Sequence, residues 1–158
     1  MGPRVHAGRF AADIEGDFVV FLIGMRINKP WRVWEWWPVF VAMPLMLREL
    51  DAAPNPPLLG WRLLLASPLS PTVIQYWRSY DDLEAYANDP ARRHKPVWQR
   101  YFRKIGLNGN VGIWHETYTI RAGDHEAIYV NMPRTGLAEA GEMRGLGSSS
   151  TSRERLSV

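Results

Sequence analysis

The chain has 158 residues, enough for one domain with an ordinary hydrophobic core. Its 46% apolar and 22% charged residues are typical of a globular protein and exclude a fibrous repeat or a fully disordered chain. The net charge of +3 is too small to indicate nucleic acid as a partner. The absence of cysteine excludes disulfides, thiolate metal sites and thiolate-ligated haem.

The longest apolar run, residues 18–25, is far shorter than the roughly 20 residues that cross a bilayer. The first 17 residues carry charges and contain no apolar stretch of the kind found in signal peptides. We therefore expect a cytoplasmic protein with no membrane partner.

The first predicted strand covers residues 17–27, where β-branched and aromatic residues dominate. Residues 31–50 are apolar on nearly all sides and predict a helix, which Pro38 and Pro44 kink or divide in two. Several of the chain's eight tryptophans fall at the start of this segment. They either pack in the core or line a pocket for a planar ligand.

The rest of the domain is predicted to form a hairpin of two strands, a second helix, a fourth strand and a short fifth strand. The second helix begins with Asp81 as its N-cap and Glu84 three residues later, and a break is expected near Pro90. In chain order, these elements cover residues 58–67, 71–80, 81–105, 111–120 and 125–132.

The order β-α-β-β-α-β predicts an α+β fold of the ferredoxin-like type, with an antiparallel sheet and two helices on one of its faces. Both alternating sets of residues in the first strand are apolar, so the other face also needs a cover. We expect a homodimer in which two sheets pack face to face through Trp114 and Tyr118. Glu116 on that face then needs a partner, such as Arg62 or Arg78.

Residues 1–133 are expected to form this single domain. From residue 134 onward, scattered glycines and a run of serines predict a flexible tail, 134–158, that packs poorly against the domain.

Two of the four histidines have a context that suggests chemistry. His94 lies on the predicted second helix and shares an apolar stripe with Trp98 and Tyr101. A neutral imidazole there is either a satisfied core residue or a ligand of a metal or a haem iron. His115 lies in the middle of the fourth strand and shares one face of it with Thr117.

In a ferredoxin-like order the second helix covers the sheet that contains the fourth strand, so His94 and His115 can face one cavity from opposite walls. With no cysteine or carboxylate cluster nearby, the pair is a poor zinc site. It fits an axial ligand and a distal acid–base group of a haem, or else two unrelated core histidines.

Arg26 and Asn28 end the first strand. Polar groups at the end of an apolar strand often point into a pocket, which is one hypothesis for this pair. The alternative is that Arg26 forms an ion pair with a carboxylate at the end of the sheet.

Four segments, residues 4–10, 16–29, 75–79 and 112–118, resemble a family of small proteins of unassigned function. That family is described as monooxygenase-like and is related to the antibiotic biosynthesis monooxygenases. The resemblance covers residues 4–133 and implies a dimeric α+β barrel. It leaves the activity open, because the superfamily includes cofactor-free monooxygenases, haem degraders, peroxidases and dehydratases.

His94 and His115 also resemble a pair found in the haem-containing aldoxime dehydratases, which have a similar barrel. Those enzymes carry a proximal histidine on the helix before the last strand and a distal catalytic histidine on that strand, in a His-Glu context. The two histidines here, 21 residues apart, fall where that pair would fall. Those enzymes are longer, and their arginine and serine partners have no counterpart located here.

The main hypothesis is an enzyme of small-molecule metabolism that uses haem b, either a monooxygenase-like oxidoreductase or an aldoxime dehydratase-like lyase acting on an N–O group. His94 would bind the iron, and His115 would act as the distal acid or base. Its substrate would be small and hydrophobic or aromatic. The other residues expected at the site are Trp98 and Tyr101 beside the cofactor and Arg26 and Asn28 beside the substrate.

Two alternatives stay open. One is a cofactor-free monooxygenase acting on an electron-rich aromatic substrate, with Arg26, Asn28, Trp31 and His115 positioning and deprotonating it. The other is a non-catalytic carrier of haem or another hydrophobic ligand.

Overall fold

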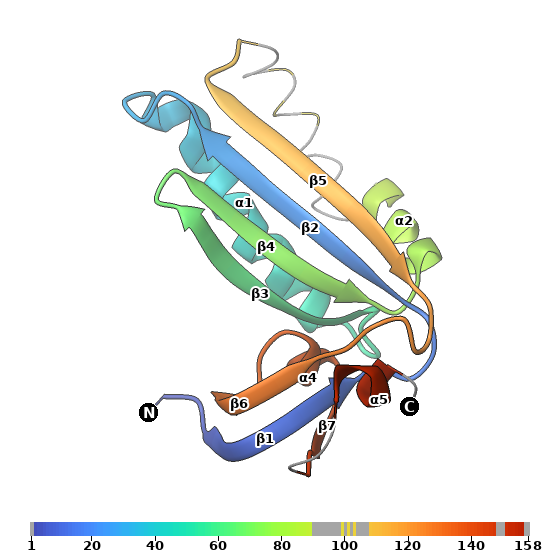
Figure 1. The fold of residues 1–158 in the computed structure, drawn as a ribbon. Helices are drawn as coiled ribbons and strands as arrows, with labels where there is room; N and C mark the ends of the chain where they lie inside the picture. Colours follow the sequence, from blue (N-terminus) through green and yellow to red (C-terminus); the bar gives the residue numbers. More distant parts are fainter. Residues whose placement is uncertain are drawn as a thin grey trace.

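The computed structural model of this chain describes residues 2–89, 99, 101, 103, 108–147 and 151–156, the last of these without the side chains of residues 154 and 155. Its largest element is a four-stranded antiparallel sheet in the order β3-β4-β2-β5, here called the main sheet (Figure 1). The bounds of these strands are β2 Phe18–Ile27, β3 Leu58–Ser67, β4 Ser70–Trp77 and β5 Val111–Ile120. All four strands lie where the sequence predicts them, except that β4 ends at Trp77 and not at residue 80.

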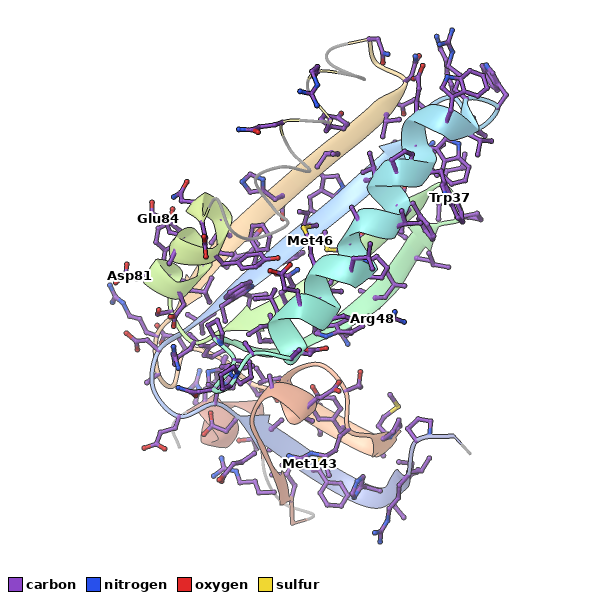
Figure 2. All side chains as sticks on the ribbon, turned by 180° about the vertical axis from the view of Figure 1, so that it is seen from behind. Trp37, Met46, Arg48, Asp81, Glu84 and Met143 are labelled. Atoms are coloured by element: carbon purple, nitrogen blue, oxygen red, sulfur yellow. The ribbon has the colours of Figure 1, made fainter. Side chains whose placement is uncertain are left out.

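Two helices lie on one face of the main sheet, as Figures 1 and 2 show from opposite sides. The long helix α1, Val33–Asp51, is a single helix that contains both Pro38 and Pro44. It is apolar on the side that faces the sheet, and its Leu47 and Leu50 join a core cluster with Val73 of β4. The predicted ferredoxin-like α+β fold is therefore confirmed.

The helix α2, Tyr80–Asn88, begins one residue earlier than the sequence predicts. Its N-cap is Ser79, whose hydroxyl accepts a hydrogen bond from the amide of Asp82 at 3.1 Å, and not Asp81. Asp82 in turn forms a bidentate ion pair with Arg78, at 2.8 and 3.0 Å. Arg78 is thus engaged at the helix start. The predicted continuation of the helix to residue 105 falls mostly outside the described residues.

A second sheet, with three strands in the order β6-β1-β7, packs at one end of the main sheet (Figure 1). Its strands are β1 Val5–Asp13, β6 Ile128–Pro133 and β7 Glu142–Gly145, and a short helix, α4 Leu137–Ala140, precedes β7. Sequence reasoning missed β1 and did not separate β6 from the main sheet. One further short helix, α5 Ser152–Leu156, lies near the C-terminus.

The expectation of a poorly packed tail from residue 134 onward needs correction. Leu137 and Ala138 are 7% and 0% exposed and share a core cluster with Phe18 of β2 and Tyr76 of β4. The strand β7 pairs with β1 in antiparallel register. Residues 137–145 are therefore part of the packed fold. Their apolar side chains cover one end of the second face of the main sheet, the face on which the two helices do not lie.

The rest of this second face of the main sheet, here called the open face, carries Trp114, Tyr118 and Leu64, which are 37%, 49% and 40% exposed. Glu116 lies there too, and its carboxylate accepts a hydrogen bond from the Tyr118 hydroxyl at 2.8 Å. The carboxylate also raises the pKa of that hydroxyl. The expected partner of Glu116, Arg62 or Arg78, is therefore replaced by a neighbouring tyrosine. Among the described residues, no helix is long and apolar enough to span a membrane.

Candidate functional site

A cavity of about 470 Å³ lies between α1, α2 and the main sheet. Most of its wall is apolar, but several polar side chains face it as well. Six of the lining residues come from five elements: Phe21 of β2, Met43 of α1, Gln75 of β4, Tyr86 of α2, and His115 and Thr117 of β5. A volume of this size is in the range of sites that hold small molecules or cofactors.

A second cavity of about 290 Å³ adjoins the first under α1. The two share Ile23, Met43, Met46 and Leu47 as walls. Figure 2 shows Met46 on the flank of α1 nearer to α2, while Trp37 and Arg48 lie on the opposite flank. The described lining of this second cavity carries no charged side chain, so it suits an apolar group.

His115 reaches the larger cavity because of strand alternation. It pairs with Ile23 of β2 in the sheet, and both side chains point to the helix-covered face. The imidazole lies against the Phe21 ring, with the two ring centroids 5.5 Å apart. The prediction that His115 and Thr117 share one face is thus met in the structure, and that face is the one with the cavity.

Gln75 is a site residue that sequence reasoning missed. It is only 5% exposed, on the same row of the sheet as Phe21. Its side-chain oxygen accepts a hydrogen bond from the Trp77 indole at 2.8 Å, and its nitrogen lies 3.9 Å from the sulfur of Met43. The signal in the sequence was a glutamine at a helix-facing position of an apolar strand, between Val73 and Trp77.

Tyr101 is buried and lines the smaller cavity. Its hydroxyl donates a hydrogen bond to the carbonyl of Val111 at 2.8 Å, and burial raises its pKa. This tyrosine anchors its segment to the start of β5. His94 and Trp98, the other residues predicted beside a cofactor, lie outside the described residues.

Arg26 and Asn28 do not reach the cavity, which corrects the prediction that they face it. Both are exposed. Arg26 points to the face of β2 opposite Ile23 and donates hydrogen bonds to the hydroxyls of Ser67 and Ser70, at 3.2 and 3.0 Å. Asn28 donates to the carbonyl of Gly109 at 2.9 Å. These residues fix the β3–β4 turn and the turn before β5.

The tryptophans at the start of α1 do not line the cavity either. Trp31, Trp34 and Trp37 are 68%, 69% and 50% exposed. Trp36 is half-buried and packs on the cluster around Met25, with its indole donating to the carbonyl of Pro30. These three exposed tryptophans therefore neither line the pocket nor pack in the core, so neither of the two predictions for this segment holds for them.

Fold and cavity together define an α+β domain of the ferredoxin-like type with an apolar cavity under its helices. A model of the monooxygenase af470-like family matches residues 18–137. The chain belongs to this family.

Individual proteins of similar sequence or structure also match this chain. Monooxygenase af470 of Aspergillus fumigatus is 31% identical over 124 residues, which are 74% of this chain and 44% of that protein. A crystal structure of an aldoxime dehydratase in complex with butyraldoxime matches with a TM-score of 0.67 and 17% identity, over 84% of this chain and 41% of that one. Another aldoxime dehydratase structure matches with a TM-score of 0.63 and 16% identity, over 89% of this chain and 44% of that one. The chain thus spans less than half the length of each of these proteins, and the two structures establish likeness of fold.

Proposed function

We propose that this protein is a small-molecule enzyme of the monooxygenase type, in which His115 accepts or donates a proton at a ligand held in the larger cavity. The observation that carries the proposal is the position of His115, an imidazole on a described lining that is otherwise largely apolar. Imidazole is the side chain best suited to proton transfer near neutral pH. Membership of a monooxygenase family supports oxygenation as the reaction class.

We further propose haem b as the cofactor, with His94 as the iron ligand. The support is the 21-residue separation of His94 and His115 and its resemblance to the aldoxime dehydratase pair. The described lining suits the apolar faces of a porphyrin, and Met46 and Leu47, on the wall shared by the two cavities, would contact it. The described lining contains no arginine or lysine for the propionates, a role that would fall to the basic run 92–104, most of which lies outside the described residues.

When bound, haem would supply redox and Lewis-acid chemistry at the substrate. The chain's own residues have two roles. The apolar walls hold the hydrophobic part of the substrate, while His115 Nδ1 or Nε2 holds the proton that is moved. In an elimination at an N–O bond, the same imidazole would protonate the departing hydroxyl.

Absorption spectroscopy of the full chain, expressed with a haem precursor, tests the cofactor. A Soret band that disappears in His94→Ala and persists in the control His6→Ala supports haem on His94. Protein that stays colourless after reconstitution with hemin overturns it, and turnover by such protein would favour the cofactor-free alternative.

Turnover tests the role of His115. His115→Asn should abolish oxygenation of phenolic substrates or dehydration of butyraldoxime, whichever the wild type performs, and leave ligand binding in place. The matched control is Thr119→Val, four residues along the same face of β5 and outside the described lining of the cavity. Equal turnover by His115→Asn and wild type contradicts the proposal. Tight binding without any turnover by the wild type would instead indicate a carrier.

We also propose that two copies pair through the open face. Trp114 and Tyr118 on β5 and Leu64 on β3 leave exposed apolar side chains at the two opposite edges of the open face, which a second sheet would cover. Large exposed apolar patches usually mark an interface.

A further inference from the structure

Gln75 is a buried amide whose orientation is fixed by its neighbour. The two ends of a glutamine amide are chemically different, one an acceptor and the other a donor of two hydrogens. The Trp77 indole can only donate, so the atom that faces it at 2.8 Å must be the Gln75 oxygen. Trp77 is 1% exposed and cannot turn away without opening the core.

The Gln75 nitrogen is therefore directed to the other side, where the cavity lies. Its one contact among the described residues is the sulfur of Met43 at 3.9 Å. A thioether is a weak acceptor, and it can engage only one of the two amide hydrogens. An amide N–H left in an apolar cavity carries a desolvation cost that an acceptor on a ligand would remove.

The sheet register places this donor across the cavity from His115. Phe21 of β2 pairs with Gln75 on one side and with Thr117 on the other. His115 lies on β5, two strands from β4, and in the row of Ile23 and Val73, two residues along from the row of Gln75. The two positions are therefore roughly 12 Å apart at the usual spacings of strands and of residues along a strand. The Phe21 ring contacts the imidazole and forms the floor between the two polar groups.

We infer that Gln75 determines specificity in this cavity by donating a hydrogen bond to an oxygen acceptor of the ligand, with Trp77 as the positioning residue. The ligand class is an apolar, ring-sized molecule that carries a carbonyl or comparable acceptor oxygen at the end remote from His115. Its ring lies over Phe21 and its reacting atom lies near the imidazole. This inference rests on the proposed function, because it takes the larger cavity as the substrate site.

A matched pair of probes tests the inference in the full chain. 2-Acetylnaphthalene carries the acceptor oxygen, and 2-isopropylnaphthalene has nearly the same shape without it. In the wild type the acetyl compound should bind about 2- to 12-fold more tightly, the range of one neutral hydrogen bond. Quenching of tryptophan fluorescence measures both affinities, and the carbonyl stretch of the bound acetyl probe should shift to lower frequency.

Gln75→Met removes the donor and keeps the length of the side chain. This variant should lose the preference for the acetyl probe and the shift of the carbonyl stretch. Gln75→Leu serves as a second variant if the first unfolds, with the melting temperature of each recorded. Thr119→Val, on the same face of β5 but outside the described lining of the cavity, is the control and should keep both the preference and the spectral shift.

The outcomes separate the two proposals. If both probes bind the wild type equally, or if the preference persists in the folded Gln75 variants, Gln75 is not the donor and the inference fails while the small-molecule site stands. If neither probe binds the wild type, the proposed site fails and the inference fails with it.

Discussion

The packing of residues 137–145 against β1 can be tested with two glycines of the same segment. A Cβ added at Gly141 would overlap the carbonyl oxygen of Asp13 and lie 2.8 Å from Cγ1 of Ile14. A Cβ added at Gly145 meets nothing within 4 Å. Neither glycine needs a left-handed backbone, so the two substitutions to alanine differ in steric fit alone.

Gly141→Ala should therefore destabilise the fold and Gly145→Ala should not. The obstacle at Gly141 is backbone, which cannot rotate away, so α4 and β7 must shift and loosen the packing around Leu137 and Ala138. Overpacking of this kind costs about 1–3 kcal/mol. For a chain of this size the melting temperature should fall by roughly 2–12 °C, at about 2–4 °C per kcal/mol. Gly145→Ala should change the free energy of unfolding by less than about 0.5 kcal/mol.

Thermal unfolding followed by circular dichroism measures both variants. Two unchanged melting temperatures would show that residues 137–145 do not dock on β1 and that the tail prediction was right after all. Equal losses in both would point to a general effect of replacing glycine in this segment, and the steric argument would be refuted.

Three further predictions concern other parts of the molecule. Tyr101→Phe removes the hydrogen bond to Val111 and should lower the free energy of unfolding in urea by about 0.5–1.5 kcal/mol, and no loss would contradict an anchoring role. Hydrogen bonds from Arg78 hold the pKa of Asp82 below its ordinary value, so the pair stabilises the fold above the unfolded-state pKa and loses this contribution as the pH falls through the lower folded-state pKa. Asp82→Asn should accordingly be less stable than wild type at pH 7, with the gap closing below about pH 4, and a gap independent of pH would count against the ion pair. Sedimentation of the wild type should give about twice 18.1 kDa, Tyr118→Glu on the open face should sediment as a monomer, and Val130→Glu on the exposed surface of β6 should remain a dimer; a monomeric wild type would refute pairing through the open face.

The main sheet could be predicted because its strands are long and rich in apolar residues, and His115 could be assigned to the correct face because β5 pairs with β2 without any register shift. The strand β1 gives no such signal. Ala11 and Ala12 are adjacent and both buried, and the pairing with β6 shifts register between His6 and Arg9, which breaks the period of two.

The tail prediction failed for a related reason. Both α4 and β7 have only four residues, too few for any periodicity to show. The glycine content that suggested flexibility has a different origin at Gly141, where a side chain would collide with β1. A glycine that is required by close approach of two backbones looks the same in a sequence as one that lends mobility.

Arg26 and Asn28 lie outside the cavity, but their hydrogen bonds hold turns of the strands that form its wall. A strand that slips by one residue turns its whole side-chain pattern to the other face, so a slip of β5 would replace His115 in the cavity by Trp114 or Glu116. The register of β5 is set along ten pairs with β2 and at its start by the turn that Asn28 holds through Gly109. The turn between β3 and β4 is held in the same way by Arg26. Polar residues at this end of the sheet thus govern which side chains face the ligand without touching it, because they fix the strands on which Gln75 and His115 lie.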